Sequence, residues 1–354
     1  MVNKNKINEK VAVALSGGVD SSFAAYLLKK KGYQVEGFTF LLCSQDGRCL
    51  GDQGLIQAQK VCDKLKIPHH ILDFKKLFRK QIIDDFLRHY SVGLTPNPCV
   101  LCNALIKFGY FFEHIDSRGF KYLATGHYVG LKRIKGKIFL KVAKDEKKSQ
   151  EYFLSLISPS ILNRLIFPLA NYTKDQVLAE VVKLDILFHD RGESQDICFI
   201  NGQAYSQFIK ENVFSPEKYK GNICHVNGKI LGTHEGIYNF TYGQRSGLGV
   251  AWRQPLYVIS IEEETKTVFV GEKEYLYKKE FTVNDLNWFD EITKYKKIEV
   301  KIRYNTPSLK CKVQVMGKEV KVSLDDKVQA ITPGQIAAFY SGDILLGGGI
   351  INSC

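Results

Sequence analysis

The sequence contains no hydrophobic run as long as a membrane span, although 45% of its 354 residues are hydrophobic. A membrane-spanning helix needs about 20 consecutive apolar residues, so none is predicted. Residues 1–10 are polar and lysine-rich and lack the apolar core of a secretory signal. Aromatic residues make up 12% of the chain, which is typical of a globular protein rather than a disordered one. We therefore expect a cytoplasmic protein with packed cores and no membrane partner.

The sequence also lacks the paired cysteines of a secreted domain. Its nine cysteines are an odd number in a chain of cytosolic character, so no disulfide framework is expected. Three of them, Cys99, Cys102 and Cys198, lie in motifs that are treated below. The other six are predicted to be packing or surface thiols: Cys43, Cys49, Cys62, Cys224, Cys311 and Cys354.

Acidic residues are outnumbered, with 37 Asp and Glu against 50 Lys and Arg, which gives a net charge of +13. A charge of this size favours association with polyanions such as nucleic acids. A basic surface that only keeps the protein soluble explains the charge equally well, so charge alone does not identify a partner.

The two commonest phosphate-binding motifs, G-x-G-x-x-G and G-x-x-x-x-G-K-[ST], are absent. Residues 11–15 (V-A-V-A-L) instead predict a strand buried on both faces, and a helix is predicted from Ser21 to Lys31. The glycine loop between them would direct backbone N–H groups at a phosphate. The hydroxyls of Ser16, Ser21 and Ser22 are expected to add donors. This S-G-G-V-D-S sequence resembles the motif of the PP-loop ATP pyrophosphatases, which cleave ATP between its α and β phosphates.

Strand and helix patterns alternate along the first half of the chain. Strands are predicted at 34–42, 67–73 and 121–128, and helices at 55–65 and 74–90. This alternation predicts an α/β domain with a doubly wound parallel sheet, whose ligands bind at the carboxyl ends of the strands.

The helix-rich pattern stops at about 205–216, and from Gly221 onward short runs alternate with turns such as Asn227-Gly228, which indicates β structure. We predict a small mixed middle domain followed by a C-terminal β-barrel. The predicted boundaries are 1–205, 206–276 and 277–354.

Two cysteine motifs stand out in the first domain. In T-P-N-P-C-V-L-C-N at 95–103, the prolines predict an extended loop, with a helix from Ala104 onward. Cys102 would then lie near the N-terminus of that helix, where the helix dipole lowers the pKa of a thiol. Cys198 lies in Q-D-I-C-F-I at 195–200; by itself, a cysteine among Ile and Phe usually belongs to the core.

Taken together, these motifs resemble the tRNA-specific 2-thiouridylases, the MnmA/TrmU family of the PP-loop, adenine nucleotide alpha hydrolase-like superfamily. The resemblance covers nearly the whole chain. The matching segments are S-G-G-V-D-S-S at 16–22, T-P-N-P-C-V-L-C-N at 95–103, A-T-G-H-Y at 124–128, Q-D-I-C-F-I at 195–200, T-Y-G-Q-R-S-G-L-G at 241–249, R-Y at 303–304 and T-P-G-Q at 332–335.

The resemblance implies an enzyme that uses ATP and Mg²⁺ to adenylate the C2 oxygen of the wobble uridine in tRNA, releasing pyrophosphate. A cysteine persulfide, loaded by a cysteine desulfurase or a sulfur-relay protein, then supplies sulfur. By motif matching, Cys198 carries the persulfide and Cys102 is the nucleophile. The ATP-binding positions implied are Ala14, Leu15, Ser16, Gly17, Gly18, Val19, Asp20, Ser21, Phe40 and Gly126. The tRNA positions implied are Asn97, Pro98 and Cys99 at the target base, and His127, Lys148, Ser149, Gln150, Arg303, Tyr304 and Gln335 elsewhere.

The chain departs from the family pattern at two places. Usual members have K-D-Q-S-Y-F where residues 148–153 are K-S-Q-E-Y-F, and many have Asp at the position of Cys99. Cys99, Cys102 and Cys198 would place three thiols in one pocket. An iron–sulfur cluster, a zinc ion and metal-free thiols all remain open.

Two other functions are compatible with part of this pattern. A different PP-loop adenylating enzyme, such as an amidotransferase-coupled ligase or a lysidine synthetase, would keep the glycine loop, and so would a non-catalytic RNA-binding protein that retains a nucleotide. Neither gives a reason for Cys102 and Cys198 together. Gln244 and Arg245 are equally compatible with contacting RNA and with bracing their own loop.

Overall fold

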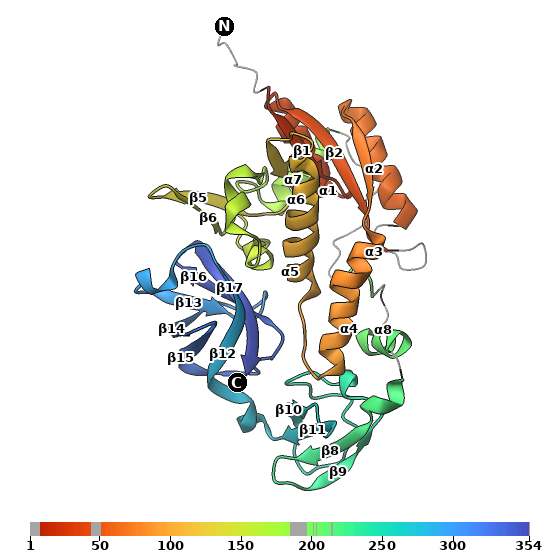
Figure 1. Cartoon of the computed structure of the whole chain (residues 1–354), viewed down its shortest axis with the longest axis vertical. Coiled ribbons are helices and arrows are strands. Elements are labelled where there is room, and N and C mark those ends of the chain that lie inside the picture. Colours follow the sequence, from red (N-terminus) through yellow and green to blue (C-terminus); the bar gives the residue numbers. More distant parts are fainter. Residues whose placement is uncertain are drawn as a thin grey trace. The chain divides into compact units, whose positions relative to one another are not determined.

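The computed structural model describes residues 8–43, 51–184, 197–200, 202, 204–213 and 215–353. The chain divides into two compact units, each of which is described by itself (Figure 1). The first unit comprises residues 1–81, 99–201 and 343–346, and the second comprises 82–98, 202–342 and 347–354.

The first unit contains a five-stranded sheet among its described residues, in which every pair of neighbouring strands is parallel. Its order is β3-β2-β1-β4-β7, so the direction of winding reverses between β1 and β4. The strands are β1 (Lys10–Ala14), β2 (Gln34–Leu41), β3 (His69–Asp73), β4 (Tyr122–Ala124) and β7 (Leu165–Ile166). The predicted doubly wound α/β domain is confirmed. Such a reversal is where ligands bind in sheets of this kind.

The helices of this unit follow the predicted alternation with one correction. The extended loop predicted up to residue 103 is wrong beyond Asn97, because a helix begins at Pro98, and proline is well suited to a first helical position. The segments are α1 (Val19–Lys30), α2 (Gly51–Leu65), α3 (Lys75–Phe78), the π-helical η2 (Arg79–Ile83), α5 (Pro98–Cys102), the π-helical η3 (Asn103–Tyr110), α6 (Phe111–Asp116), the 3₁₀ turns η4 (Glu151–Leu154) and η5 (Pro159–Arg164), and α7 (Lys174–Lys183).

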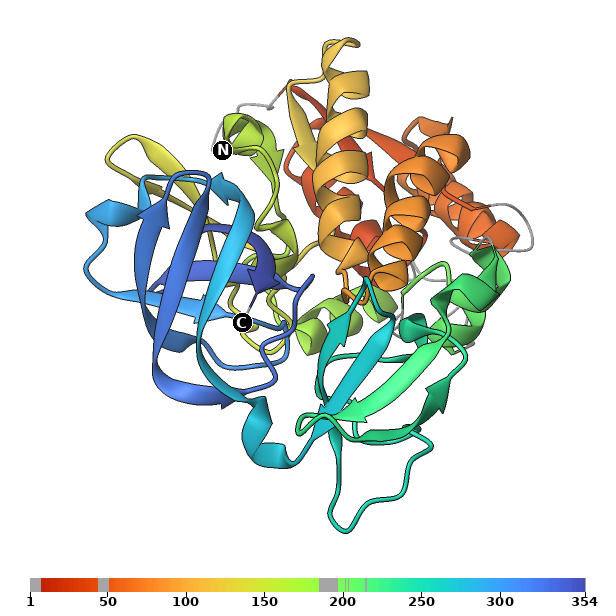
Figure 2. The same cartoon turned by 60° about the horizontal axis from the view of Figure 1, so that its bottom comes forward.

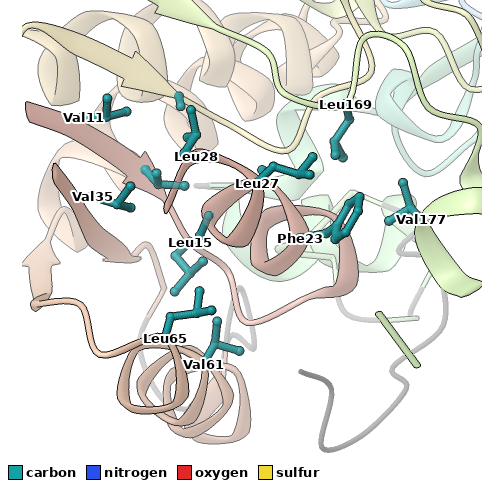
Figure 3. Close-up of a cluster of buried hydrophobic side chains, with 14 of the residues drawn as sticks. Val11, Leu15, Phe23, Leu27, Leu28, Val35, Val61, Leu65, Leu169 and Val177 are labelled. Carbon is teal, nitrogen blue, oxygen red and sulfur yellow. The ribbon is translucent and has the colours of Figure 1, made fainter. Parts of the chain in front are cut away.

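A hydrophobic core joins α1 to both α2 and α7 (Figure 3). Phe23 and Leu27 of α1 share this cluster with Val177 of α7, and the rings of Phe23 and Tyr172 meet edge to face at 5.3 Å. Burial of each large apolar side chain contributes roughly 1.5–3 kcal/mol. This packing fixes the start of α7 beside the start of α1, although the two helices are far apart in the sequence.

The first unit also holds a hairpin that the sequence did not predict. Strands β5 (Gly130–Ile134) and β6 (Lys137–Lys141) pair antiparallel, and Lys141 pairs with Ile344 at the start of β17 (Ile344–Ser353).

The second unit begins with α4 (Asp84–Ser91) and α8 (Tyr205–Asn212) and includes a four-stranded sheet of order β10-β11-β8-β9 within its described part. The core of this sheet includes Ile223, Val258 and Val268. The predicted small middle domain is confirmed as a fold. Its strands are β8 (Gly221–His225), β9 (Ile230–His234), β10 (Tyr257–Glu262) and β11 (Thr267–Gly271).

The predicted C-terminal barrel is also confirmed. Neighbouring strands follow the order β12-β15-β14-β13-β16-β17, and an antiparallel pairing of β12 with β17 closes the ring. Figure 2 shows these strands, in blue, curving around a common centre. They are β12 (Tyr277–Trp288), β13 (Ile298–Lys301), β14 (Leu309–Met316), β15 (Glu319–Gln329), β16 (Ile336–Ser341) and β17. No helix in the described part of the chain combines the length and apolarity needed to cross a membrane.

Candidate functional site

Two glycine turns meet at the reversal point between β1 and β4. A Cβ atom on Gly126, after β4, would lie only 2.7 Å from the backbone N of Ser21. Gly17, after β1, has a φ of +75°, and its Cβ would lie 2.6 Å from the carbonyl oxygen of Gly54. Only glycine fits either contact. The structure therefore brings together the predicted phosphate loop and Gly126, which lie far apart in the sequence.

The serines of the loop hold its shape. The Ser21 hydroxyl accepts from the Ser16 N–H at 3.2 Å and donates to the Gly18 carbonyl at 3.1 Å. The hydroxyl of the fully buried Ser22 donates to the same carbonyl at 2.8 Å. Both hydroxyls are therefore engaged within the loop, and their donation to a phosphate stays a prediction. No side chain caps the start of α1 at Gly18, so its first N–H groups, which have no partner within the helix, can bind an anion.

Asp20, in the first turn of α1, is held by two residues that the sequence analysis missed. The Lys174 ammonium lies 2.8 and 2.7 Å from the two carboxylate oxygens of Asp20, and the Tyr128 hydroxyl donates to one of them at 2.8 Å. The sequence contained one indication that Lys174 is unusual. Lys174 is the first residue of a capped helix, where the helix dipole disfavours a cation.

Phe40, the predicted nucleotide contact on β2, is half-buried near the carboxyl end of its strand. Its ring centroid lies 5.6 Å from that of Phe74 and 4.7 Å from that of Phe111. Because β2 neighbours β1 in the sheet, Phe40 lies at the same sheet edge as the phosphate loop. Its ring is a candidate surface for a bound nucleotide.

The three motif cysteines converge in the first unit. Cys99 and Cys102 lie one helical turn apart in α5 and therefore on one side of it. Each also helps to raise the pKa of Cys198 through charge repulsion, so the three thiols are close to one another. Cys99 and Cys198 are exposed, whereas Cys102 is buried.

Desolvation by the surrounding protein is the largest influence on the pKa values of all three thiols, including those of the surface residues Cys99 and Cys198. It raises the pKa of Cys198 to about 12, and it also raises the pKa values of Cys99 and Cys102. The predicted lowering of the Cys102 pKa is wrong, because the helix begins at Pro98 and Cys102 lies beyond its N-terminus. Lys107, in the π-helical segment η3, is the cation that lowers all three pKa values, and the sequence analysis missed it.

The remaining cysteines divide into three groups. Cys62, Cys224 and Cys311 are buried and free, as predicted for packing thiols. Cys43 is disulfide-bonded, which corrects the prediction of a free thiol at this position. Cys49 and Cys354 lie outside the described residues, as do Gln195 and Asp196 of the Cys198 motif.

His127 follows Gly126 at the end of β4. Its Nδ1 lies 2.7 Å from the Thr125 hydroxyl, and its ring centroid lies 5.8 Å from that of Phe108. Burial lowers the His127 pKa to about 3, with a smaller contribution from Lys107. The imidazole is therefore neutral at physiological pH, so it cannot attract RNA phosphates through charge.

The turn at 148–150 lies against the strand end that carries His127. Gln150 exchanges hydrogen bonds with the backbone of Tyr128, its N–H donating at 2.8 Å and its side-chain oxygen accepting at 2.9 Å. Ser149 is buried, and its hydroxyl accepts from the Ala143 N–H at 2.8 Å and donates to Glu151. The Ser149 hydroxyl therefore braces the turn, and its predicted tRNA contact stays a prediction. Lys148 is half-buried in the same turn.

In the second unit, one hydrogen-bond network joins the predicted tRNA positions of the barrel to the loop at 95–96. The Arg303 guanidinium donates to the Ala330 carbonyl at 2.7 Å and to the Thr332 hydroxyl at 2.9 Å. The Gln335 N–H donates to the Thr332 carbonyl at 3.2 Å, and its side-chain amide donates to the Thr95 carbonyl at 2.8 Å. Two motifs distant in the sequence are therefore adjacent within this unit. Tyr304, next to Arg303, is half-buried, and Asn97 belongs to the same loop as Thr95.

The glycine-rich loop of the middle domain is held by Gln244. Its side-chain oxygen accepts from the Thr241 N–H, and its amide donates to the Ser246 carbonyl, both at 2.9 Å. Arg245 is exposed and makes no such bond within the described part of the chain. Of the two alternatives left open by the sequence, bracing the loop therefore applies to Gln244. Arg245 extends into solvent and is available to contact RNA.

Comparison with known proteins agrees with this arrangement. Three family models match consecutive parts of the chain: a tRNA methyl transferase HUP domain at 9–202, a tRNA methyl transferase PRC-barrel domain at 206–272 and an aminomethyltransferase beta-barrel domain at 278–351. The tRNA-specific 2-thiouridylase MnmA of Carboxydothermus hydrogenoformans is 41% identical, with 97% of each chain covered. This chain belongs to the tRNA-specific 2-thiouridylase family.

Further similarities lie inside and outside this family. The tRNA-specific 2-thiouridylase MnmA 2 of Clostridium tetani is 38% identical over 98% of this chain and 99% of its own. Among solved structures, the U34-tRNA thiolase NcsA of Methanococcus maripaludis with its [4Fe-4S] cluster is 19% identical and covers 59% of this chain and 67% of its own, with a TM-score of 0.38. A similarity this distant does not show that this chain shares the activity or the cluster of that protein.

Residues 148–153 differ from the family pattern, and the structure shows the contacts of the residues that differ. The 2-thiouridylase pattern has an acid at the second position and a hydroxyl at the fourth, whereas this chain has Ser149 and Glu151. The Ser149 hydroxyl donates to the fully buried Glu151 carboxylate. The acid–hydroxyl pair is therefore present with its two members exchanged, so the missing Asp does not leave the turn without a carboxylate.

Proposed function

We propose that this chain is an ATP-dependent tRNA-uridine 2-sulfurtransferase that makes 2-thiouridine at the wobble position. One observation carries this proposal. A phosphate loop at the reversal point of the sheet and two motif cysteines belong to the same unit of a chain that is 41% identical over its length to a tRNA-specific 2-thiouridylase. Adenylation needs the phosphate loop, and sulfur transfer needs the cysteines.

The first half-reaction uses the phosphate loop. The C2 oxygen of the uridine attacks the α phosphorus of ATP, and the bond to the β phosphate breaks, so pyrophosphate leaves. The N–H groups at the start of α1 are placed to stabilise the negative charge of the phosphates. A Mg²⁺ ion would share that charge. Phe40 and Gly126 complete the nucleotide site in this proposal.

The second half-reaction uses the thiols. Cys198 is exposed, so a donor protein can load it with a persulfide. The terminal sulfur attacks C2 and AMP leaves, which joins the base to Cys198 through a disulfide bond. The Cys102 thiolate then attacks the Cys198 sulfur, the thiouridine is released, and an external dithiol reduces the resulting Cys102–Cys198 disulfide.

The tRNA contacts remain proposals for individual residues. The charge of +13 and the exposed Arg245 support RNA binding by the whole chain. Asn97, Pro98 and Cys99 are proposed to meet the base. His127, as a neutral imidazole, and Ser149 are proposed to lie along the tRNA. Lys148, Gln150, Arg303, Tyr304 and Gln335 are proposed to lie along the tRNA.

The cysteines do not form a ready metal site. In the described part of the chain, no group of three or more His, Cys, Asp or Glu side chains is arranged to hold a metal ion. This finding concerns single metal ions, so an iron–sulfur cluster at Cys99, Cys102 and Cys198 stays a prediction, and the proposed steps are written with metal-free thiols. Iron, zinc and acid-labile sulfide assays on anaerobically purified protein test this directly.

The experiment that tests the function combines the protein with tRNA, ATP, Mg²⁺ and a persulfide donor. We expect 2-thiouridine by nucleoside mass spectrometry, with AMP and pyrophosphate released in equal amounts. Release of ADP, or AMP formation with a different modified nucleoside, would contradict the proposal. A Cys198→Ser variant should still bind ATP and tRNA but should carry no persulfide sulfur.

A further inference from the structure

The ion pair between Asp20 and Lys174 lies at the phosphate loop and is not explained by the steps above. Lys174 approaches both oxygens of the carboxylate at 2.8 and 2.7 Å, and its side chain is only 15% exposed. Both carboxylate oxygens have a cationic partner, which makes this a strong form of ion pair. The described residues offer this carboxylate no other cation.

The fold fixes Lys174 in place. Thr173 caps α7, accepting from the Gln176 N–H at 3.3 Å while the Gln176 side chain accepts from the Thr173 N–H at 3.0 Å. The backbone N–H of Lys174 donates to Asp145 at 2.9 Å. The core of Figure 3 joins α7 to α1, and the Lys174 ammonium reaches the Asp20 carboxylate in the first turn of α1.

The location creates an electrostatic conflict. Asp20 lies in the first turn of α1, where the helix dipole favours a negative charge. The phosphates of ATP would be attracted to the same helix end for the same reason. An unpaired carboxylate there would repel a polyphosphate bound at the same helix end, and the 34% exposure of the Asp20 side chain means that solvent screens only part of the repulsion.

We propose that Lys174 is part of the nucleotide site and that it admits ATP by neutralising Asp20. Tyr128 holds the carboxylate against Lys174 by donating to Oδ1. The pair therefore presents the phosphates with a neutral unit rather than with a negative charge. This inference rests on the proposed function only through ATP binding and does not depend on tRNA or sulfur.

A double-mutant cycle tests it by equilibrium binding of Mg²⁺-ATP, measured by calorimetry without tRNA. Lys174→Met should weaken ATP binding at least about tenfold, because it leaves one charge of a close ion pair unpaired beside a polyanion. Asp20→Asn combined with Lys174→Met should recover most of that loss, because the repelling charge is then gone. Lys174→Arg should retain affinity close to that of the wild type.

Lys183 supplies the matched control, since it lies on the same helix and its ion pair with Glu180 is exposed. Lys183→Met should leave ATP affinity unchanged. Thermal unfolding of each variant identifies any that fail to fold, and Lys174→Gln, which keeps a hydrogen-bond donor without the charge, replaces Lys174→Met in that case.

Three results would overturn the inference. Unchanged ATP affinity in Lys174→Met would mean that the pair only supports the fold. Failure of Asp20→Asn to recover affinity in the double variant would mean that Lys174 acts on the phosphates directly. Absence of ATP binding by the wild-type protein would overturn this inference together with the proposed function. Absence of tRNA thiolation, with the expected ATP affinities of all variants, would overturn the proposed function alone.

Discussion

The reactivity of Cys198 gives a direct test of the proposed site. Burial and the neighbouring thiols of Cys102 and Cys99 raise its pKa to about 12. Only the thiolate reacts with alkylating reagents. The resting protein should therefore keep Cys198 protonated, and the thiol should become nucleophilic only when tRNA or a sulfur donor changes its surroundings.

The size of the effect follows from the ionisation equilibrium. At neutral pH, a thiol of pKa about 12 is ionised about a thousandfold less than one with the usual value of 9.0. Cys198 is exposed as a residue, but desolvation is the largest cause of its raised pKa. Slow alkylation at pH 7 alone therefore does not separate protonation from limited access, and the pH dependence of the rate is what reports the pKa.

The assay measures iodoacetamide labelling of the Cys198 peptide by mass spectrometry between pH 6 and pH 10. We expect labelling about a thousandfold slower than that of the unfolded protein at pH 7, with a rate that still rises at pH 10. Lys107→Met should slow labelling further, because Lys107 lowers the pKa of Cys198. Cys102→Ser should speed it, because Cys102 raises that pKa.

A pH profile that levels off near pH 8 or 9 would refute this reasoning, since it would show an ordinary thiol in the resting protein. Faster labelling in Lys107→Met would also refute it, because the sign of the Lys107 contribution would then be wrong. The same profile measured with tRNA bound would show whether the substrate lowers the pKa of Cys198.

Three further predictions follow from individual contacts. Gly126→Ala should lower the free energy of unfolding by about 1–3 kcal/mol through overpacking and abolish ATP binding, because the added Cβ would lie 2.7 Å from the Ser21 N. Thermal unfolding measures the first effect and calorimetry the second. The control Gly18→Ala should have normal stability, because the nearest atom to its Cβ lies at an ordinary 3.5 Å. Ser149→Asp alone should destabilise the protein by placing a second carboxylate beside Glu151, and adding Glu151→Ser should restore the melting temperature; additive losses would contradict the exchanged pair. Neutralisation of about six tRNA phosphates should cost about three decades of affinity between roughly 50 and 200 mM salt, and Arg245→Ala should reduce that slope by about one; an unchanged slope would exclude Arg245 from the interface.

Much of the fold was accessible from the sequence because it rests on local patterns. The buried strand before the S-G-G-V-D-S loop and the helix after it each depend on residues close together in the chain, and both were found where predicted, within two residues at each end. The parallel sheet followed from the alternation of strands and helices. Family motifs then supplied the chemistry that no single pattern could specify.

Electrostatic environments depended on tertiary structure instead. A dipole argument for Cys102 needed the true helix start at Pro98 and the burial of the thiol, and both arise from packing. Lys174 reaches Asp20 only because two helix faces share one core, and the Ser22 hydroxyl is engaged within the loop by a bond to Gly18. Local periodicity specifies which residues form an element, whereas the charge and burial of a side chain depend on neighbours that the chain brings from far away. The sequence alone therefore determined the elements and the family, and only the tertiary structure decided which groups are charged, buried or paired at the site.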